Sequence, residues 1–452
     1  MKQKALFFFE SILLGMILLF SACGAAQGGG QAASAPGAPP LSTAQTAGKA
    51  DAAPDAGAPE DAAALRLVTS DENFSSRKTT GNENGYYYVD RSDHINAVNA
   101  NLRYIDYATA QDIYLSSRPE ANHLTPEDDS YIPSVAGLGV AFPVGDSLFL
   151  LRTGAPDYAD QFGQDALAAV FRMELDGSNR RQIYTGAGDE ILLSTAAADD
   201  RYLYLISQRI EEDAETPTIG GYLIRVDQRT GETKELCRLS AHAFLIGAGD
   251  GLLIFHNIID TREEDVISRS HEILVCDIAS ETLRTVETWS QDSGRAVAVS
   301  GGLLIMASPL SRTVSVRALR TDETAAEYPL PDGLPADIDH FLYPGCYDGH
   351  FLFWDYSTRT IYALDLASGE WSAVGLEYMD PIKDDSRPVE IYAETATHFL
   401  VCRDQEWVTR SYFDPGTGTP YETERVQLVF ALIAKEDYWA SVPNYREIRF
   451  NG

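Results

Sequence analysis

Cys23 is the residue whose surroundings predict a definite chemistry. Lys2 and Lys4 precede an apolar run over residues 5–20 that Glu10 interrupts, and Cys23 follows this run after two small residues. A short positive segment, an apolar segment and small residues before a cleavage site are typical of an export signal. The apolar run is short for a membrane span. We therefore expect an export signal that ends at Cys23.

The residues before Cys23 resemble the lipobox of bacterial lipoproteins. The stretch reads Leu19-Phe20-Ser21-Ala22-Cys23, and Phe20 departs from the pattern, which more often has Leu three places before the Cys. The resemblance implies that Cys23 carries diacylglycerol and that a dedicated peptidase cuts before it. The mature chain is then anchored on the extracytoplasmic face of the cell membrane. An ordinary signal peptide with a chance cysteine and an uncleaved anchor are the alternatives.

The other four cysteines show no spacing that predicts a metal or redox site. Cys237, Cys276, Cys346 and Cys402 are scattered without a CxxC pair, whereas zinc sites and dithiol motifs need closely spaced thiolates. Several of them lie in or beside apolar runs. We expect buried thiols that pack as small apolar side chains.

The acidic and histidine residues also fall short of a recognisable catalytic pattern. Three acidic runs, at 127–129, 211–213 and 263–265, lie in polar stretches that are typical of solvated loops, and none has the alternating ligands and glycine of a calcium loop. No HExxH, GxSxG, P-loop or GxGxxG stands in a suitable context. The sequence therefore predicts no catalytic residue, no metal ligand and no cofactor.

Charge and composition limit the partners. The formal net charge is −32, and 44% of the residues are hydrophobic. A strongly acidic chain lacks the clustered Lys and Arg that nucleic acids and anionic headgroups attract, so we exclude nucleic acid as a partner. The apolar content is ample for a folded core.

The chain divides into three parts by composition. Residues 1–22 form the predicted signal, and residues 23–64 comprise the lipidated cysteine and a stretch of Ala, Gly, Pro, Gln and Ser. Such a stretch has too little apolar surface to offset chain entropy, and we expect a disordered tether there. Residues 65–452 form the predicted folded domain.

From residue 65 onward the chain repeats one sequence pattern of short strands. Its first half is an apolar strand, a tight Asp/Gly turn and a second apolar strand, as in residues 243–256, 295–307 and 340–354. Its second half is a hairpin with an Asp at its turn, as in residues 223–232 and 361–370. Asp, Ser, Thr and Gly suit tight turns between paired strands.

The spacing of the repeat predicts an all-β fold, a β-propeller. The hairpin residues Asp176, Asp227 and Asp277 are 51 and 50 residues apart, and a period near 50 with four short strands is typical of propeller blades. Strands of unrelated sandwiches are the alternative.

The number of copies of this pattern favours eight four-stranded blades, with seven as the alternative. The first half occurs eight times, the last at 438–440, and the second half is complete seven times and half-present at 445–450. We expect the N-terminal strand 65–69 to complete the last blade, because this would join the chain ends and remove exposed sheet edges.

The repeated pattern resembles the divergent propellers of secreted Firmicute lipoproteins, with DUF5050-like and TolB-like repeats, over most of residues 80–450. A more specific likeness lies at Leu115, Pro119 and His123, which match a segment that in many such lipoproteins carries three cysteines; this chain has none there. We therefore exclude thiol chemistry at this place and interpret His123 as a loop residue and not as a metal ligand. The resemblance implies no established activity.

Two classes of function remain open on the sequence. The absence of a fixed polar constellation favours a binding or scaffold module, a monomer that takes a protein, peptide or glycan ligand. The alternative is an extracellular hydrolase or lyase acting on glycans, with carboxylates from several blades meeting at the channel mouth.

The Cys23 prediction can be checked by the intact mass of protein extracted from native membranes. We expect a chain that starts at residue 23 and carries the added mass of lipid, and a Cys23→Ala variant that is unprocessed or released. An unmodified full-length chain in the cytosol would contradict the export and the anchor together.

Overall fold

The computed structural model describes residues 65–73, 76–79, 81–90, 99–118, 123, 125–133, 139–211, 218–263, 266–291, 295–332, 334, 341–355, 358–413 and 419–450. They belong to the compact unit Ala62–Gly452. The predicted signal, the tether and Cys23 lie outside the described residues. No helix within the described ranges is long and apolar enough to cross a bilayer.

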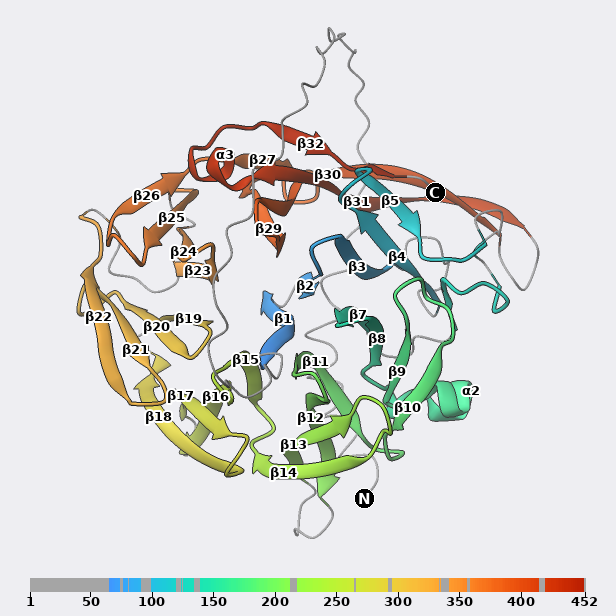
Figure 1. Cartoon of the computed structure of the whole chain (residues 1–452), viewed down its shortest axis with the longest axis horizontal. Helices are drawn as coiled ribbons and strands as arrows, with labels where there is room; N and C mark the ends of the chain where they lie inside the picture. Colours follow the sequence, from blue (N-terminus) through green and yellow to red (C-terminus); the bar gives the residue numbers. More distant parts are fainter. Residues whose placement is uncertain are drawn as a thin grey trace, which may run out of the picture. The chain divides into compact units, whose positions relative to one another are not determined.

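Seven four-stranded blades form a β-propeller over the described part of the chain (Figure 1). We call the strands of each blade A to D from the middle of the ring outward. Blade 1 contains β3 (Gly85–Asp90), β4 (Ala100–Asp106), β5 (Gln111–Tyr114) and β33 (Arg449–Phe450), with β6 (Tyr131–Ile132) beside β4. Blade 2 contains β7 (Gly139–Val144), β8 (Ser147–Arg152), β9 (Ala169–Glu174) and β10 (Arg181–Thr185). Blade 3 contains β11 (Ile191–Ala198), β12 (Tyr202–Glu211), β13 (Thr218–Asp227) and β14 (Thr233–Leu239).

The remaining blades follow in chain order. Blade 4 contains β15 (Ala243–Gly249), β16 (Leu252–Glu263), β17 (Val266–Asp277) and β18 (Thr282–Ser290). Blade 5 contains β19 (Ala296–Ser300), β20 (Leu303–Ser308), β21 (Thr313–Ala318) and β22 (Glu323–Pro329). Blade 6 contains β23 (Phe341–Tyr347), β24 (His350–Asp355), β25 (Thr360–Asp365) and β26 (Trp371–Val374). Blade 7 contains β29 (Glu390–Glu394), β30 (His398–Phe413), β31 (Pro420–Ala434) and β32 (Tyr445–Glu447).

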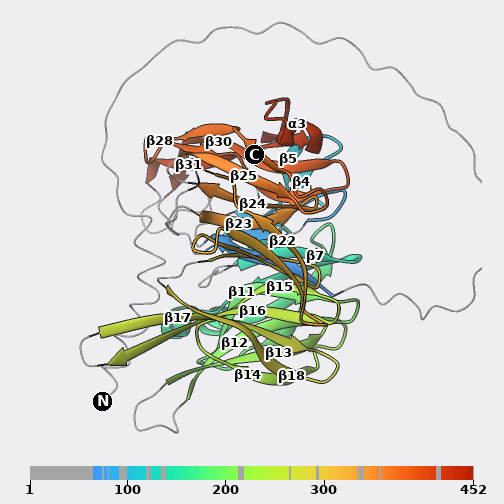
Figure 2. The same cartoon turned by 90° about the vertical axis from the view of Figure 1, so that its left-hand side faces the viewer.

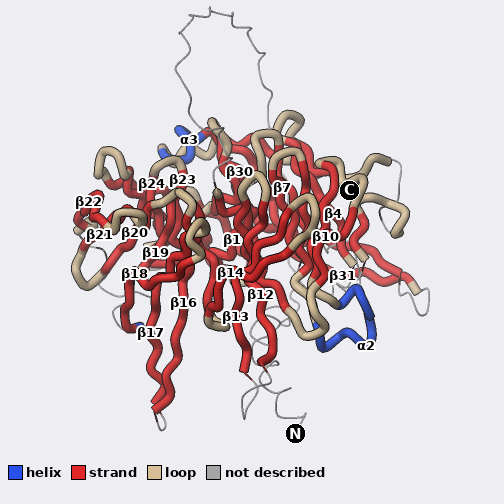
Figure 3. Tube along the Cα trace, turned by 60° about the horizontal axis from the view of Figure 1, so that its bottom comes forward, coloured by secondary structure: helices blue, strands red, loops and turns tan. Residues whose placement is uncertain are grey.

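The other elements interrupt this order. A separate hairpin, β27 (Glu377–Asp380) and β28 (Asp385–Pro388), joins blades 6 and 7. Short helices η1 (Pro156–Tyr158), α2 (Ala159–Phe162) and η2 (Gly163–Ala166) lie between β8 and β9, and α3 (Lys435–Trp439) follows β31. The B–C connections all lie on one face because successive strands are antiparallel. On that face the hairpins β12–β13 and β16–β17 project beyond the other strands (Figure 3), and Figure 2 shows β17 and β28 on the same side.

The repeated aspartates stabilise the turns between strands C and D, as the sequence pattern predicted. Asp227 Oδ1 accepts hydrogen bonds from the main-chain N–H groups of Arg229 and Thr230, at 3.0 and 2.8 Å. Gly231 follows with φ +75°, a conformation in which glycine is favoured. Asp277 and Asp365 make the same bonds in blades 4 and 6. The period of the repeat therefore reflects one turn chemistry used once in each of these blades.

The apolar core lies between blades, because both faces of each sheet pack against a neighbour. Leu223 of blade 3 and Leu253 and Phe255 of blade 4 are fully buried in one shared cluster. Near the middle of the ring the strands come so close that only small residues fit. A Cβ atom on Gly249 would lie 2.4 Å from the backbone carbon of Gly301.

The N-terminal strand β1 (Arg66–Asn73) lies in the middle of the ring (Figure 1). It pairs antiparallel with β11, with Arg66 opposite Ala198, and β2 (Ser76–Thr79) pairs with β1. β1 contacts the innermost strands β7, β15 and β23, and β2 contacts β7 and β29. The prediction that residues 65–69 complete the last blade is therefore wrong: Val68 is fully buried among innermost strands.

Thr69 makes the contact that fixes β1 on blade 3. The pairing of β11 with β12 shifts in register between Leu192 and Ala196. The Thr69 hydroxyl donates to the Ser194 carbonyl at 2.5 Å and accepts from the Ala196 N–H at 2.9 Å. One side chain thus satisfies both buried groups.

Blade 1 receives its outer strand from the C-terminal end of the chain. After β32 completes blade 7, Arg449 and Phe450 pair in parallel with Gln111 and Asp112 of β5. Arg103 of β4 lies between the rings of Tyr114 and Phe450, with its guanidinium carbon 4.1 Å from each ring centre. Residues 445–450 thus connect blade 7 to blade 1 on the outside of the ring.

The eighth copy of the first half of the repeat, at residues 438–440, belongs to helix α3 and its end and not to a strand. Tyr438 is buried edge-on against Phe399, with ring centres 5.3 Å apart, and its hydroxyl donates to the Val389 carbonyl at 3.1 Å. The aromatic residues Tyr438 and Trp439 pack helix α3 on blade 7, and in the sequence they look the same as the aromatic residues of an apolar strand. The all-β propeller prediction is confirmed, with seven blades, the alternative number.

The Thr69 contact leads to a stability prediction. Thr69→Val keeps the shape of the side chain and removes the hydroxyl that bonds the Ser194 carbonyl and the Ala196 N–H, so we expect the free energy of unfolding to fall by about 2 kcal/mol. Urea unfolding measures the change. Thr69→Ser retains the hydroxyl and should lose less; equal stability of the valine variant and the wild type would contradict this role of Thr69.

Candidate functional site

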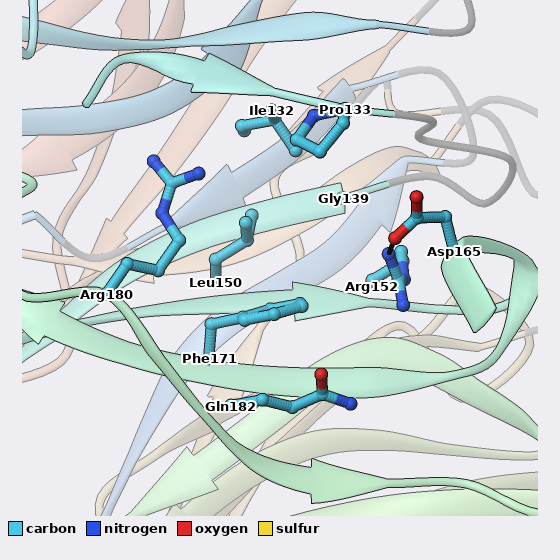
Figure 4. Close-up of a pocket in the computed structure, with 9 residues that line it drawn as sticks. All are labelled: Ile132, Pro133, Gly139, Leu150, Arg152, Asp165, Phe171, Arg180 and Gln182. Atoms are coloured by element: carbon cyan, nitrogen blue, oxygen red, sulfur yellow. Dashed lines mark hydrogen bonds and ion pairs between the residues drawn. The ribbon is translucent and has the colours of Figure 1, made fainter. Parts of the chain in front are cut away.

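A pocket of about 150 Å³ lies on the flank of blade 2 that faces blade 1 (Figure 4). Ile132 of strand β6 and Pro133, which follows it, form one wall. Leu150 of β8 and Phe171 of β9 form the apolar part of the opposite wall, because they are opposite each other in the sheet. Arg152 and Arg180 lie at the two ends with Leu150 between them.

Arg152 is held by the helical insertion between β8 and β9. Its guanidinium donates to the carbonyls of Leu167 and Gln164, at 2.9 and 3.0 Å, and lies 3.3 Å from the Asp165 carboxylate. It also lies over the Phe171 ring, 5.4 Å from the ring centre. The Arg152 side chain is 5% exposed and that of Asp165 is 49% exposed. The arginine is therefore fixed, whereas the carboxylate is the partner that solvent or a ligand can displace.

Arg180 lies at the other end and connects blade 2 to the β6 segment. It donates to the carbonyl of Tyr131 at 2.8 Å and to that of Asp129. Its Nε atom is buried without a hydrogen-bond partner among the described residues. One donor of a half-buried cation is thus left unsatisfied beside the pocket.

Burial disfavours the charged form of both guanidinium groups. Loss of hydration lowers the pKa of Arg152 and of Arg180, and nearby carboxylates oppose this only in part. Both groups stay charged at neutral pH because arginine keeps its proton in proteins. An anion that entered the pocket would therefore meet positive charge that the protein itself compensates incompletely.

The middle of the ring, where a channel-mouth site would lie, is occupied over its described length by β1. Beside β1, strands β11 and β15 carry the small side chains Ala196, Ala197, Ala198 and Ala248, which are all buried. The middle of the ring is thus filled by the chain itself over the described residues (Figure 1).

Two histidines, His256 of β16 and His271 of β17, meet on the hairpin that projects from blade 4. His256 Nε2 and His271 Nδ1 are 3.0 Å apart in a hydrogen bond, and both rings stack on Trp289. Burial, and then the His271 charge, lower the pKa of His256 to about 4. Burial and Arg269 lower that of His271, which Asp260 opposes. The pair is therefore neutral near pH 7.

The cysteines and His123, which the sequence analysis singled out, line neither the pocket nor the histidine pair. Cys237, Cys276, Cys346 and Cys402 form no disulfide within the described residues, and the first two belong to the core cluster between blades 3 and 4. His123 lies in a loop, stacked on Tyr114 with ring centres 4.0 Å apart.

The acidic runs are only partly described. The expectation of a solvated loop is wrong for Asp128, which is buried and accepts two hydrogen bonds from Ser130. Residues 212–213 and 264–265 lie outside the described ranges. Within those ranges no group of three or more His, Cys, Asp or Glu side chains is placed to hold a metal ion.

Sequence reasoning missed both arginines and the histidine pair. Arg152 directly follows the buried apolar stretch 147–151, and a charged residue at the end of such a strand is a signal that could have identified it. Arg180 follows a polar turn and carries no such signal. His256 and His271 are 15 residues apart, and only the register of the hairpin brings them together.

No family model matches this chain. No curated protein matches it either. Among solved structures it is similar to an oligogalacturonate lyase in complex with manganese, with 16% identity and a TM-score of 0.40 over 65% of this chain and 74% of the lyase. It is also similar to puromycin hydrolase, with 12% identity and a TM-score of 0.44 over 78% of this chain and 57% of that one. TolB from Acinetobacter baumannii gives 10% identity and a TM-score of 0.31 over 80% and 78%. These similarities concern the fold alone.

The histidine pair predicts a loss of stability in mild acid. The pKa of His256 is about 4 in the folded chain and about 6.5 in an unfolded one, so the folded state binds fewer protons between these values. The contribution is complete above about pH 6.5 and is lost as the pH falls towards 4, by at most about 3 kcal/mol. Thermal unfolding between pH 7 and 4 measures it.

A His256→Gln variant should show a shallower decrease of Tm with falling pH than the wild type. The matched control is His242→Gln, which removes an exposed histidine and should leave the pH dependence unchanged. If the His256→Gln curve runs parallel to that of the wild type, the pair does not contribute in this way.

Proposed function

We propose that the protein is a membrane-anchored extracytoplasmic binding protein, and not an enzyme, that holds a partner peptide in the pocket between blades 1 and 2. The export segment and the lipobox-like residues before Cys23 support the location. The single observation that supports binding is a pocket with apolar walls and an arginine at each end. We propose that it acts as a monomer.

The size of the pocket favours one anchoring side chain over a whole small molecule. Sites that enclose drug-sized ligands have volumes of roughly 300–1,000 Å³, and this pocket has about 150 Å³. Binding energy at protein interfaces is concentrated in a few side chains that fill such pockets. A macromolecular partner that inserts one residue therefore fits the volume.

The two arginines of the pocket favour a ligand that carries a carboxylate close to its anchoring side chain. Arg152 keeps its position through carbonyl contacts, so a ligand carboxylate can replace the half-exposed Asp165 without moving the arginine. Arginine binds carboxylates in a planar, two-pronged geometry. In a peptide, an apolar side chain and a carboxylate share one Cα atom only at the C-terminal residue. We propose a peptide C terminus that ends in Leu, Ile or Phe.

A peptide fits the pocket better than a glycan. Sugars bind to open aromatic faces and many hydrogen-bonding groups, whereas the Phe171 ring is covered by Arg152 and the Gln182 amide donates to Tyr184 and Thr185. Ile132, Pro133 and Leu150 add apolar contacts that a hydroxyl-rich ligand would not use.

Selection from a pool of random peptides with free C termini tests the proposal. We expect the full-length protein to enrich peptides that end in an apolar residue, and Arg152→Gln to bind the best of them at least about tenfold more weakly, because it removes the guanidinium that would pair with the C-terminal carboxylate. Amidation of the C terminus of that peptide should weaken binding to the wild type similarly.

Arg181→Gln is the matched control, since it makes the same change in charge at an exposed position of the same blade. It should bind like the wild type. Equal binding by the Arg152→Gln variant, or enrichment of peptides without regard to their last residue, would contradict a carboxylate-binding pocket.

A further inference from the structure

His256 and His271 bring two imidazole nitrogens together on the hairpin β16–β17 of blade 4. His256 Nε2 and His271 Nδ1 are 3.0 Å apart. The residues lie diagonally across the two strands, because His271 is opposite Ile258 in the register. Both side chains are half-buried and keep some contact with solvent. The hairpin therefore offers two nitrogen ligands at one accessible point.

The separation of these nitrogens matches two neighbouring ligands of one transition-metal ion. Bonds from zinc to an imidazole nitrogen are about 2.0–2.1 Å long. At square-planar or tetrahedral angles such bonds hold two nitrogens roughly 2.9–3.4 Å apart. The observed 3.0 Å lies within this range. Binding of an ion therefore requires the two lone pairs to turn from each other towards it, and the nitrogens need not move apart.

The indole of Trp289 fixes both rings. Trp289 lies on β18 opposite His271 and is buried. The rings of His271 and His256 stack on it at interplanar angles of 12° and 20°, with ring centres 5.4 and 5.6 Å away. The two imidazole centres are 5.1 Å apart, so both rings lie on the same side of the indole. Side chains that packing has already ordered lose less entropy when they bind a ligand.

The charges beside the pair are compatible with a bound cation. Arg269, whose charge acts on the His271 ring, donates to Asp260 at 2.7 and 2.9 Å. Arg295, which lies over the indole, donates to Glu287 at 2.7 Å. Each of these guanidinium groups is thus compensated by a carboxylate. The net charge of −32 also attracts cations to the protein.

We propose that His256 and His271 are the protein ligands of a divalent transition-metal ion, with water in its remaining positions. Imidazole suits Cu²⁺ and Zn²⁺, and Cu²⁺ is bound the more tightly in the general order of affinities. The site is independent of the arginine pocket between blades 1 and 2.

Coordination requires a change of tautomer and no net loss of protons. Both rings are neutral near pH 7, because burial and then the His271 charge lower the pKa of His256 to about 4, and burial also lowers that of His271. The proton of each neutral ring then lies on the nitrogen that faces away from the ion, Nδ1 of His256 and Nε2 of His271. The two facing nitrogens are left free to bind.

Titration of the purified full-length protein with Zn²⁺ at pH 7 tests the proposal. Zinc has no redox chemistry, so the heat of binding cannot come from oxidation of cysteines. Calorimetry should show saturable binding, and a free zinc concentration of about 100 times Kd should raise Tm by about 3 °C. Absence of saturable binding by the wild type would overturn the proposal.

Variants assign the binding to this pair. His256→Gln and His271→Gln should each bind Zn²⁺ at least about tenfold more weakly, because one of two protein ligands is lost. His398→Gln removes an exposed histidine of blade 7 and should bind like the wild type. Cu²⁺ should quench tryptophan fluorescence in the wild type and much less in Trp289→Phe. Wild-type affinity in either of the first two variants, or undiminished quenching in Trp289→Phe, would place the ion elsewhere and overturn the proposal.

Discussion

The structure depends on closure of the ring at the boundary between blades 1 and 7. Every blade buries both faces against its neighbours, so a ring that opened at one boundary would expose two apolar faces at once. Arg103 stands at this boundary, fully buried, paired with Asp112 at 3.1 Å and enclosed by Tyr114 and Phe450. Burial raises the pKa of Asp112, whereas Arg103 and Tyr88 favour its charged form. Removing one member of such a buried pair leaves an uncompensated charge, which is more destabilising than the pair itself is stabilising.

The middle of the ring is subject to a different constraint. Seven blades leave a space at the axis, and β1 occupies it by adding to the edge of β11, where Thr69 satisfies the interrupted main chain. Small residues on the innermost strands make room for it. The surfaces left for partners are the faces and the flanks of the propeller, and the pocket with Arg152 and Arg180 lies on such a flank.

The candidate pocket lies at a boundary between blades. It is lined by residues of blades 1 and 2. It therefore combines residues from two sheets that share no hydrogen-bonded strand pair. In a repeat fold the blades carry stability, and the boundaries between them can vary in chemistry without disturbing the turn aspartates that define each blade.

The local structure follows from short-range features of the sequence. Alternating apolar strands and the turn residues Asp227, Asp277 and Asp365 are local features, because each depends on neighbours within a few positions, and they predicted an all-β propeller with four-stranded blades. The number of blades and the sites depend on long-range packing. Residues 65–69 and Tyr438 have the composition of blade strands, but β1 pairs at the axis and Tyr438 lies in α3. Arg152 and Arg180 share a pocket because β6 of blade 1 packs beside blade 2, and His256 meets His271 through the register of a hairpin. Neither arrangement can be derived from residues that are neighbours in the sequence.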